Sequence, residues 1–370
     1  MSIYLNTESN IDNTHHDNSI VITANVAGDA SMMHMGASLV TEYKKHGYSV
    51  QGALEQSLEA CEPFKYIVLN RVGVGEFPDA VAKKNLQLVD RWISDPNKFV
   101  TYYIDDLLVH LNNNLPIEFM KRCENVVTSN HVLKNYLEEH CYIPEARIVP
   151  THVNYDFVDN IKPVNHVIPM KEDHFKIYWA SLGRIGTRFM IEFLRLANEI
   201  EEFKEIDIMC VGMNIMKTRM QIAQFRNVNL YFHEALSLDK FFALGKTCDM
   251  MINPVSLEEL AEFYDDENMQ KLWLSSKCEP KFAAAGAMRI PLLSGNMRAY
   301  TEAINDGKDG FISDDPKEWI DIILELKKNK DLRTYIGNNA RKRAETTYDY
   351  KQRTLDYIKA FTQPAEDDDE

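Results

Sequence analysis

The sequence predicts an α/β protein made of two doubly wound lobes. Three observations predict this fold: a length of 370 residues, short β-rich runs that alternate with longer amphipathic stretches, and a break in that alternation after residue 150. Helices that connect parallel strands cover both faces of a sheet. Two such lobes facing a central cleft would bind ligands at the carboxyl ends of their strands.

Composition narrows the class of protein. Hydrophobic residues make up 45% and charged residues 26% of the chain, as in globular proteins. The net charge of −15 disfavours non-specific binding to nucleic acid, although a local basic groove is still compatible with it. The first twenty residues are polar and no long apolar run follows, so we expect a cytoplasmic protein without a membrane span. The six scattered cysteines are expected to be reduced and mostly buried.

The first lobe is assigned to residues 19–160, after a polar segment, 1–18, that lacks apolar periodicity and is predicted to be mobile. Its strands are predicted at 20–24, 66–70, 99–104, 125–129 and 147–150, and helices at 80–93 and 132–139. An aperiodic segment with Pro163 and Pro169 follows, as expected of a linker.

The second lobe is assigned to residues 170–347. Its strands are predicted at 176–180, 206–211, 228–232, 250–253 and 290–294, and helices at 189–201, 238–244 and 316–327. Residues 350–361 have the apolar spacing of an amphipathic helix, which needs a surface to cover. The chain ends in an acidic tail, 363–370.

Residues 181–188 join a predicted strand to a predicted helix and contain Gly183, Arg184 and Arg188, with Thr187 placed as a helix cap. Backbone N–H groups and the helix dipole at such a junction favour a phosphate. A tight turn with surface arginines is the alternative interpretation.

Lys281 is the second candidate for anion binding. Pro280 suits the first position of a helix, which places Lys281 in the first turn. A cation there is unfavourable by about 0.3–1 kcal/mol, so Lys281 should have an anionic partner. An ordinary Ala-rich helix packed on the sheet would explain residues 283–287 but not Lys281.

Residues 250–350 resemble the donor lobe of the GT-B-fold glycosyltransferases, in the large retaining group 1 family that includes many bacterial transferases of surface polysaccharide synthesis. The resemblance is carried by Lys281, the small residues 283–287 and the Pro-Leu-Leu-Ser run at 291–294. Residues 300–311 resemble the family's y-x-E-x-I-x-D-G-x-x-G-f segment, and 336–341 with 347–350 resemble its closing segment.

The resemblance implies two Rossmann-like lobes and transfer of a sugar from a UDP- or GDP-sugar to an acceptor hydroxyl, with a glycan as the expected acceptor. It also implies no metal and no tightly bound cofactor. The first lobe would bind the acceptor, the second the donor, and a helix at 348–362 would cross back to the first lobe.

Three positions depart from the family pattern. Ala284 stands where a glutamate usually holds the donor ribose, Arg289 where a glycine is usual, and Ser276 where the first acidic residue of the paired-glutamate motif would stand. Ser276 is therefore counted among the donor-binding candidates. Either the donor is held unusually or the chain is a non-catalytic relative that binds a nucleotide or glycan.

The acceptor side offers Asp105 and Asp106 at the end of a predicted strand. Adjacent residues of a strand point to opposite sides, so at most one of the two is expected to face a ligand. That residue could act as general base on the acceptor hydroxyl. A purely structural role for both is the alternative. Arg71, His34 and Gly36 follow other strands and could line the same cleft.

In a third interpretation, the protein is a glycosyltransferase whose acceptor is DNA, as in phage transferases that glycosylate modified bases. The acidic balance of the chain argues against it. A basic groove leading to Asp105 would favour it.

Overall fold

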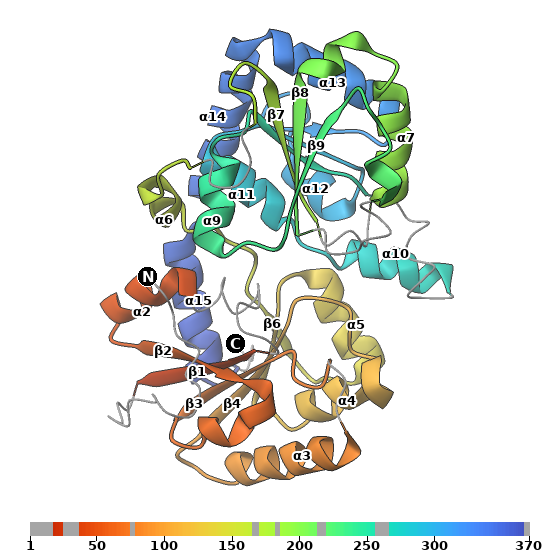
Figure 1. The fold of residues 1–370 in the computed structure, drawn as a ribbon. Coiled ribbons are helices and arrows are strands. Elements are labelled where there is room, and N and C mark those ends of the chain that lie inside the picture. The colour runs from red at the N-terminus through yellow and green to blue at the C-terminus, as the bar shows by residue number, and fades with distance from the viewer. Residues whose placement is uncertain are drawn as a thin grey trace. The chain divides into compact units, whose positions relative to one another are not determined.

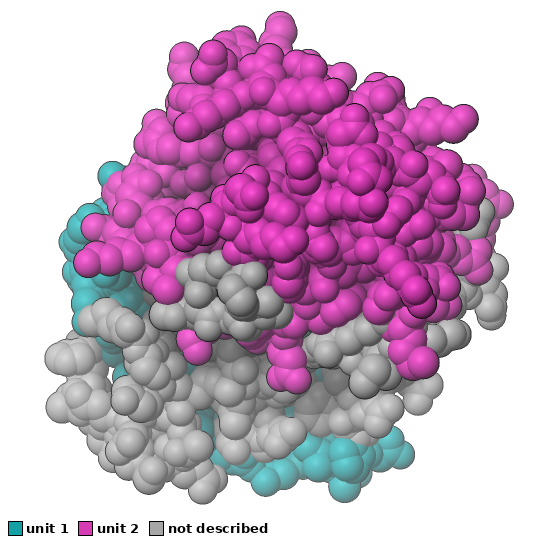
Figure 2. Space-filling model, turned by 45° about the horizontal axis from the view of Figure 1, so that its top comes forward, with its two compact units in different colours: residues 1–151, 350–370 teal, residues 152–349 magenta. Residues whose placement is uncertain are grey.

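The computed structural model describes residues 18–24, 37–74, 78–164, 170–181, 186–212, 220–255 and 266–365. The chain forms two compact units, which Figure 2 distinguishes by colour: Met1–Thr151 with Tyr350–Glu370, and His152–Asp349. Within these described residues, each unit contains one six-stranded sheet, and every strand pair in both sheets is parallel. The predicted fold class, two doubly wound α/β lobes, is confirmed.

The first unit has the strand order β2-β1-β3-β4-β5-β6. Its strands are β1 (Ser19–Ala24), β2 (Ser49–Leu54), β3 (Tyr66–Asn70), β4 (Phe99–Ile104), β5 (Asn125–Thr128) and β6 (Ala146–Ile148). Its helices include α2 (Val40–Lys45), α3 (Asp79–Ile93), α4 (Leu111–Met120), α5 (His131–Cys141) and α15 (Tyr350–Thr362). Figure 1 shows these helices around the sheet.

Helix α15 packs on the sheet of the first unit although it lies more than 200 residues after β5 in the sequence. The Asn125 side chain donates to the carbonyl oxygens of Ala360 and Gln363, both at 2.7 Å. The rings of Tyr103 and Tyr357 lie 6.3 Å apart. The last helix therefore covers strands β3 to β5 of the first unit.

The second unit has the strand order β12-β11-β10-β7-β8-β9. Its strands are β7 (Phe175–Ala180), β8 (Ile206–Val211), β9 (Asn229–His233), β10 (Met250–Asn253), β11 (Leu292–Ser294) and β12 (Phe311–Ile312). Its helices include α6 (Tyr155–Asn160), α7 (Thr187–Ala197), α9 (Leu238–Gly245), α10 (Glu267–Ser275), α11 (Pro280–Met288), α12 (Arg298–Ala303), α13 (Pro316–Lys328) and α14 (Lys330–Thr346).

Side chains of β7 alternate between the two faces of this sheet, as the strand period requires. Ile177 and Trp179 lie in the core formed with α7 and α13. Tyr178 points to the opposite face, where its hydroxyl donates to the carbonyl of Phe241 in α9. Helices thus cover both faces, which explains why these strands are apolar throughout.

Residues 152–160 belong to the second unit, whereas the sequence assigned them to the first lobe. The cause is a pair of cations from the second unit. Arg341 forms two hydrogen bonds with the carboxylate of Asp159, at 2.6 and 3.0 Å. Lys246 donates to the carbonyl of Ile161 at 2.8 Å, just beyond α6. These contacts hold α6 against its own unit.

All six cysteines are free thiols, and Cys61, Cys141, Cys210 and Cys248 are buried, as predicted. Burial raises the pKa of the Cys61 and Cys248 thiols to about 12. Among the described helices, none combines the length and the apolar character needed to span a membrane.

Candidate functional site

The second unit has a topological switch point between β7 and β10. Strands β8 and β9, which follow β7 in the sequence, lie on one side of β7 in the sheet. Strands β11 and β12, which follow β10, lie on the opposite side, beyond β10. In open α/β sheets, ligands bind outside the carboxyl ends of the two strands at such a point. Any ligand of this unit is therefore expected beside Ala180 and Asn253, where β7 and β10 end.

Gly186 brings the segments that follow these two strands together. It has a φ of +85° and directly precedes α7. A Cβ at position 186 would collide with the carbonyl oxygen of Pro254, which follows β10. Only glycine fits here, because both the left-handed backbone and the close approach exclude a side chain.

Lys281 extends from the first turn of α11 to the end of β10. Its Nζ donates to Oδ1 of Asn253 at 2.6 Å. The Asn253 amide is oriented in turn, because its Nδ2 donates to Oγ of Ser294 at 2.9 Å. Asn253 and Ser294 end adjacent strands, so Lys281 lies at the carboxyl edge of the sheet, next to the switch point.

The Lys281 ammonium lacks a counter-ion within the part of the chain that the structure describes. No carboxylate there lies within ion-pair distance of Nζ. Burial, together with repulsion from Lys277, lowers the pKa of Lys281 to about 8. The N-terminus of α11 adds further positive potential. The negative charge of an anionic ligand would compensate for the desolvation of the ammonium and for its repulsion by Lys277.

The other donor-side candidates differ in their surroundings. Arg188 is exposed on the first turn of α7, which begins beside the same switch point. Ser276 is fully buried, and its hydroxyl donates to the carbonyl of Trp273 at 2.8 Å, inside its own helix turn. Gly183 and Arg184 lie outside the described residues.

Two of the three positions that depart from the family pattern, Ala284 and Arg289, lie in α11 and directly after it. Ala284 is buried and, as an alanine, supplies no carboxylate. Arg289 follows the helix with a φ of +62°, the left-handed conformation that usually selects glycine after a helix. The backbone therefore has the shape expected with glycine at this position, while the residue itself is arginine.

In the first unit, the structure brings together two candidates that the sequence treats separately. Nη1 of Arg71 lies 3.6 Å from Oδ1 of Asp105, and both side chains are about one-fifth exposed, at 19% and 21%. Arg71 follows β3 and Asp105 follows β4. The switch point of this sheet lies between β1 and β3, so the pair lies at the carboxyl edge beside it.

Arg71 adopts a left-handed backbone with a φ of +53°, which is uncommon for a residue with a side chain. Its N–H donates to the carbonyl of Tyr103 at 2.9 Å, which helps to hold this conformation. Strained conformations of this kind are concentrated at functional sites. Asp106 is half-buried next to Asp105, and His34 and Gly36 lie outside the described residues.

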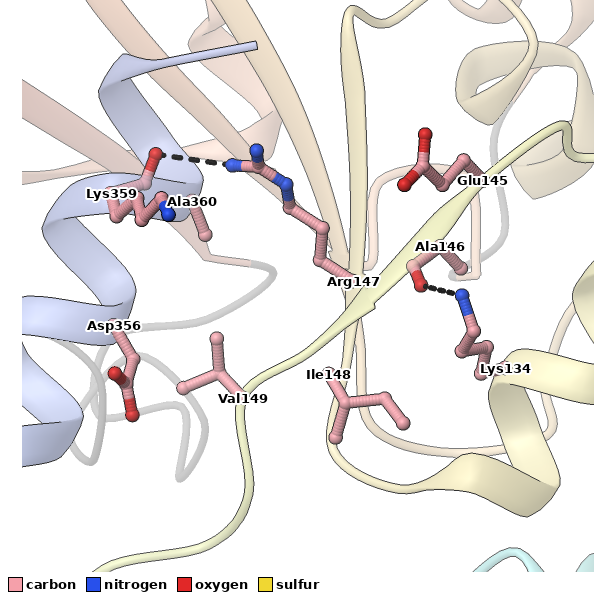
Figure 3. Close-up of a pocket in the computed structure, with 9 residues that line it drawn as sticks. All are labelled: Lys134, Glu145, Ala146, Arg147, Ile148, Val149, Asp356, Lys359 and Ala360. Carbon is pink, nitrogen blue, oxygen red and sulfur yellow. Dashed lines mark hydrogen bonds between the residues drawn. The ribbon is translucent and has the colours of Figure 1, made fainter. Parts of the chain in front are cut away.

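A hollow of about 380 Å³ lies elsewhere in the first unit, beside edge strand β6 and helix α15 (Figure 3). Two basic side chains that line it donate hydrogen bonds to backbone carbonyls of the same unit. Lys134 donates to the carbonyl of Ala146 at 2.7 Å, and Arg147 donates to the carbonyls of Lys359 and Gln363 at the end of α15. None of the predicted site residues that the structure describes lines this hollow.

Sequence reasoning missed Asn253, Ser294 and Gly186 as site residues. A usable signal was present for the first two, since each is a polar residue at the carboxyl end of a buried apolar strand. Their roles depend on contacts with Lys281 and with each other, across 28 and 41 residues of sequence. No local pattern encodes those distances.

No family model matches the sequence, and no curated protein matches it either. Solved structures do share the architecture. WaaG, a glycosyltransferase involved in lipopolysaccharide biosynthesis, is 14% identical with a TM-score of 0.63, over 93% of this chain and 99% of WaaG. A glycosyltransferase from Rickettsia africae is 12% identical with a TM-score of 0.60, over 94% and 99%.

A third solved structure contains a bound nucleotide sugar. HepE of Anabaena in complex with UDP-glucose is 12% identical to this chain, with a TM-score of 0.61 over 92% and 99% of the two chains. At these identities, the likeness establishes the two-lobed GT-B fold.

Proposed function

We propose that the protein is a glycosyltransferase that takes its sugar from a nucleoside diphosphate sugar bound to the second unit. One observation carries the proposal. Lys281 presents a partly buried ammonium without a counter-ion among the described residues, at the start of α11 and beside the switch point of a doubly wound sheet. A pyrophosphate supplies the missing negative charge. The HepE complex with UDP-glucose shows that this fold accommodates such a donor.

The reaction breaks the bond between the anomeric carbon and the diphosphate and forms a bond to the acceptor oxygen. Negative charge grows on the departing phosphate. The Lys281 ammonium and the positive end of the α11 helix dipole stabilise that charge in place, which lowers the barrier without a metal ion. Asn253 contributes by fixing the position of Nζ.

Asp105 is proposed as the base that receives the proton of the acceptor hydroxyl. Arg71 holds its carboxylate from one side, and the carboxylate is still partly exposed to a ligand. Of the two adjacent aspartates, the ion pair with Arg71 favours Asp105 for this role. Arg184, Arg188 and Gly183 remain proposed donor contacts at the start of α7.

We further propose a glycan acceptor and a cytoplasmic reaction. The retaining outcome implied by the family resemblance is proposed with them, and it requires the acceptor oxygen to attack the face of the anomeric carbon that the diphosphate leaves. An acceptor series of oligosaccharides, with duplex DNA containing hydroxymethylated bases as a separate arm, tests the acceptor. Product that appears only with DNA would overturn the glycan assignment.

The donor assignment is tested with UDP- and GDP-sugars supplied as a pool, with product detection by mass spectrometry. We expect donor-dependent glycosylation of an acceptor or slow hydrolysis of one donor. Binding of a nucleotide sugar without either reaction would instead identify a non-catalytic binding protein. Absence of binding to any donor would reject the proposal.

A matched pair of lysine variants makes the test specific. Lys281→Met is expected to weaken UDP or GDP binding by about tenfold or more, which corresponds to about 1.4 kcal/mol. Lys327→Met is the control, because Lys327 pairs with Glu205 at the amino end of the same sheet. Equal affinity in both variants would remove Lys281 from the site.

A further inference from the structure

The carboxylate of Glu279 contacts a distant tyrosine. Glu279 is the residue directly before α11 and two before Lys281, yet its side chain makes no capping hydrogen bond to the helix. Oε1 instead accepts a hydrogen bond from the hydroxyl of Tyr348 at 2.9 Å. The Tyr348 ring also packs edge-on against Phe282, with centroids 6.1 Å apart. Tyr348 thus contacts the residues on both sides of the first turn that carries Lys281.

The backbone of Tyr348 is fixed to a second segment of the unit. Its carbonyl accepts from the N–H of Val153 at 3.2 Å, and Val153 pairs with Asp349 in a parallel bridge. The hydroxyl of Tyr155 lies 3.4 Å from Oδ1 of Asp349. The chain passes from one unit to the other at 151–152 and at 349–350. The two crossing segments are therefore joined to each other within the second unit, next to Tyr348.

The Glu279–Tyr348 contact is partly buried. Tyr348 is 3% exposed, and burial is the main cause that raises the pKa of both Glu279 and Tyr348. A buried polar pair is costly unless its hydrogen bond is made, so loss of either partner leaves the other unsatisfied. The start of α11 and the crossing segments are consequently held in one arrangement.

We propose that Glu279 and Tyr348 are positioning residues for Lys281, and that they link its ligand site to the two segments through which the chain passes between units. The proposal rests on the proposed function, because it takes the ligand of Lys281 to be a diphosphate. A diphosphate that binds Lys281 also fixes the first turn of α11. Glu279 and Phe282 transmit this restraint to Tyr348, and Tyr348 transmits it to Val153 and Asp349.

Three substitutions test the role of the hydrogen bond separately from the packing of the two side chains. Tyr348→Phe removes the hydroxyl and keeps the ring beside Phe282. Glu279→Ala removes the acceptor, whereas Glu279→Gln retains an acceptor oxygen and should rescue the link. Tyr335→Phe is the control, because Tyr335 is an exposed tyrosine of α14.

The measurements are calorimetric affinity for UDP and GDP and hydrogen exchange at 152–155 and 347–350, with and without the nucleotide. Wild type, Glu279→Gln and Tyr335→Phe should show protection of both segments on binding. Tyr348→Phe and Glu279→Ala should lose that protection and bind the nucleotide about fivefold more weakly or worse. A purely structural hydrogen bond would change stability without changing the protection that the ligand induces.

Protection of the two segments that persists in Tyr348→Phe, or that is absent from the wild type with nucleotide bound, would overturn the link. If neither nucleotide binds the wild type, the proposed function fails. The link between the first turn of α11 and the two crossing segments is then tested by hydrogen exchange of the ligand-free proteins. Faster exchange in both the first turn of α11 and the two crossing segments of Glu279→Ala then supports it. Faster exchange in only one of them refutes it.

Discussion

The carbonyl oxygen of Arg289 lies directly against the α-carbon of Gly337, where a Cβ would collide with it. Helices α11 and α14 also approach each other at Gly286, where an added Cβ would be 2.5 Å from the carbonyl oxygen of Ala340. Small residues therefore hold α11 tightly against α14. Since α11 carries Lys281, this packing determines where the proposed donor site lies.

Gly337→Ala is expected to destabilise the protein by about 1–3 kcal/mol, because the added methyl forces two packed helices apart. Thermal and urea unfolding measure the change. Asn338→Ala is the control, since Asn338 is exposed on the same helix and alanine has the higher helix propensity. A wild-type unfolding midpoint for Gly337→Ala would mean that the two helices separate at negligible cost.

Arg289→Gly is expected to stabilise the protein by about 1 kcal/mol, because it relieves a left-handed backbone at a residue with a Cβ. The exposed Arg289 side chain leaves little packing to lose. The measurement is the free energy of unfolding in urea. Lys342→Gly, at an exposed position inside α14, should show the opposite sign, about 1 kcal/mol less stable. Destabilisation by both substitutions would show that Arg289 has a stabilising contact of its own.

Much of the fold was predictable because buried strands are compact apolar runs bounded by polar residues. Strands β3, β4 and β10 begin and end where the sequence predicts. Strand β2 was missed, since Gln51 and Gly52 interrupt its apolar pattern. Helix α14 was not predicted as a unit, because its buried face consists largely of small residues and Arg341 rather than an apolar stripe.

The candidate site was predictable only one residue at a time. Lys281 stood out because a cation in a first helical turn is unfavourable, and that argument is local. Its partner Asn253 and the pairing of Arg71 with Asp105 depend on which strands become neighbours in the sheet. Sequence periodicity predicts strands without fixing their order, so these pairs emerged only from the structure.

Diphosphate affinity should depend on pH through Lys281. Its pKa is about 8 without ligand, below the ordinary value of 10.5, and a bound diphosphate raises it by stabilising the ammonium. Affinity should therefore be level below pH 8 and fall as pH rises above 8, with proton uptake on binding. Calorimetry of UDP and GDP between pH 7.5 and 9.5 measures both. Lys281→Arg stays charged and should flatten the profile, whereas a flat wild-type profile would contradict the assignment.

The same lowered pKa predicts that Lys281→Met stabilises the protein without ligand. Below pH 8 the folded state must keep a desolvated ammonium, which the unfolded chain accommodates in water. Between about pH 8 and 10.5 the unfolded chain binds more protons at this residue, so wild-type stability should rise relative to Lys281→Met. Unfolding curves of both proteins at pH 7 and pH 9.5 test the sign. A less stable Lys281→Met at pH 7 would indicate that the ammonium is already compensated.

Asp105→Asn should lower turnover by about a hundredfold or more, the range typical for loss of a general base, while donor affinity stays at the wild-type value. The reason is that Asp105 and Lys281 belong to different units, so the change leaves the proposed donor site intact. Steady-state kinetics with saturating donor measure turnover, and calorimetry measures donor binding. Asp106→Asn is the matched control at the adjacent position and should retain most of the activity. A larger loss in Asp106→Asn than in Asp105→Asn would transfer the role of base to Asp106, and equal small losses would assign both carboxylates to the fold.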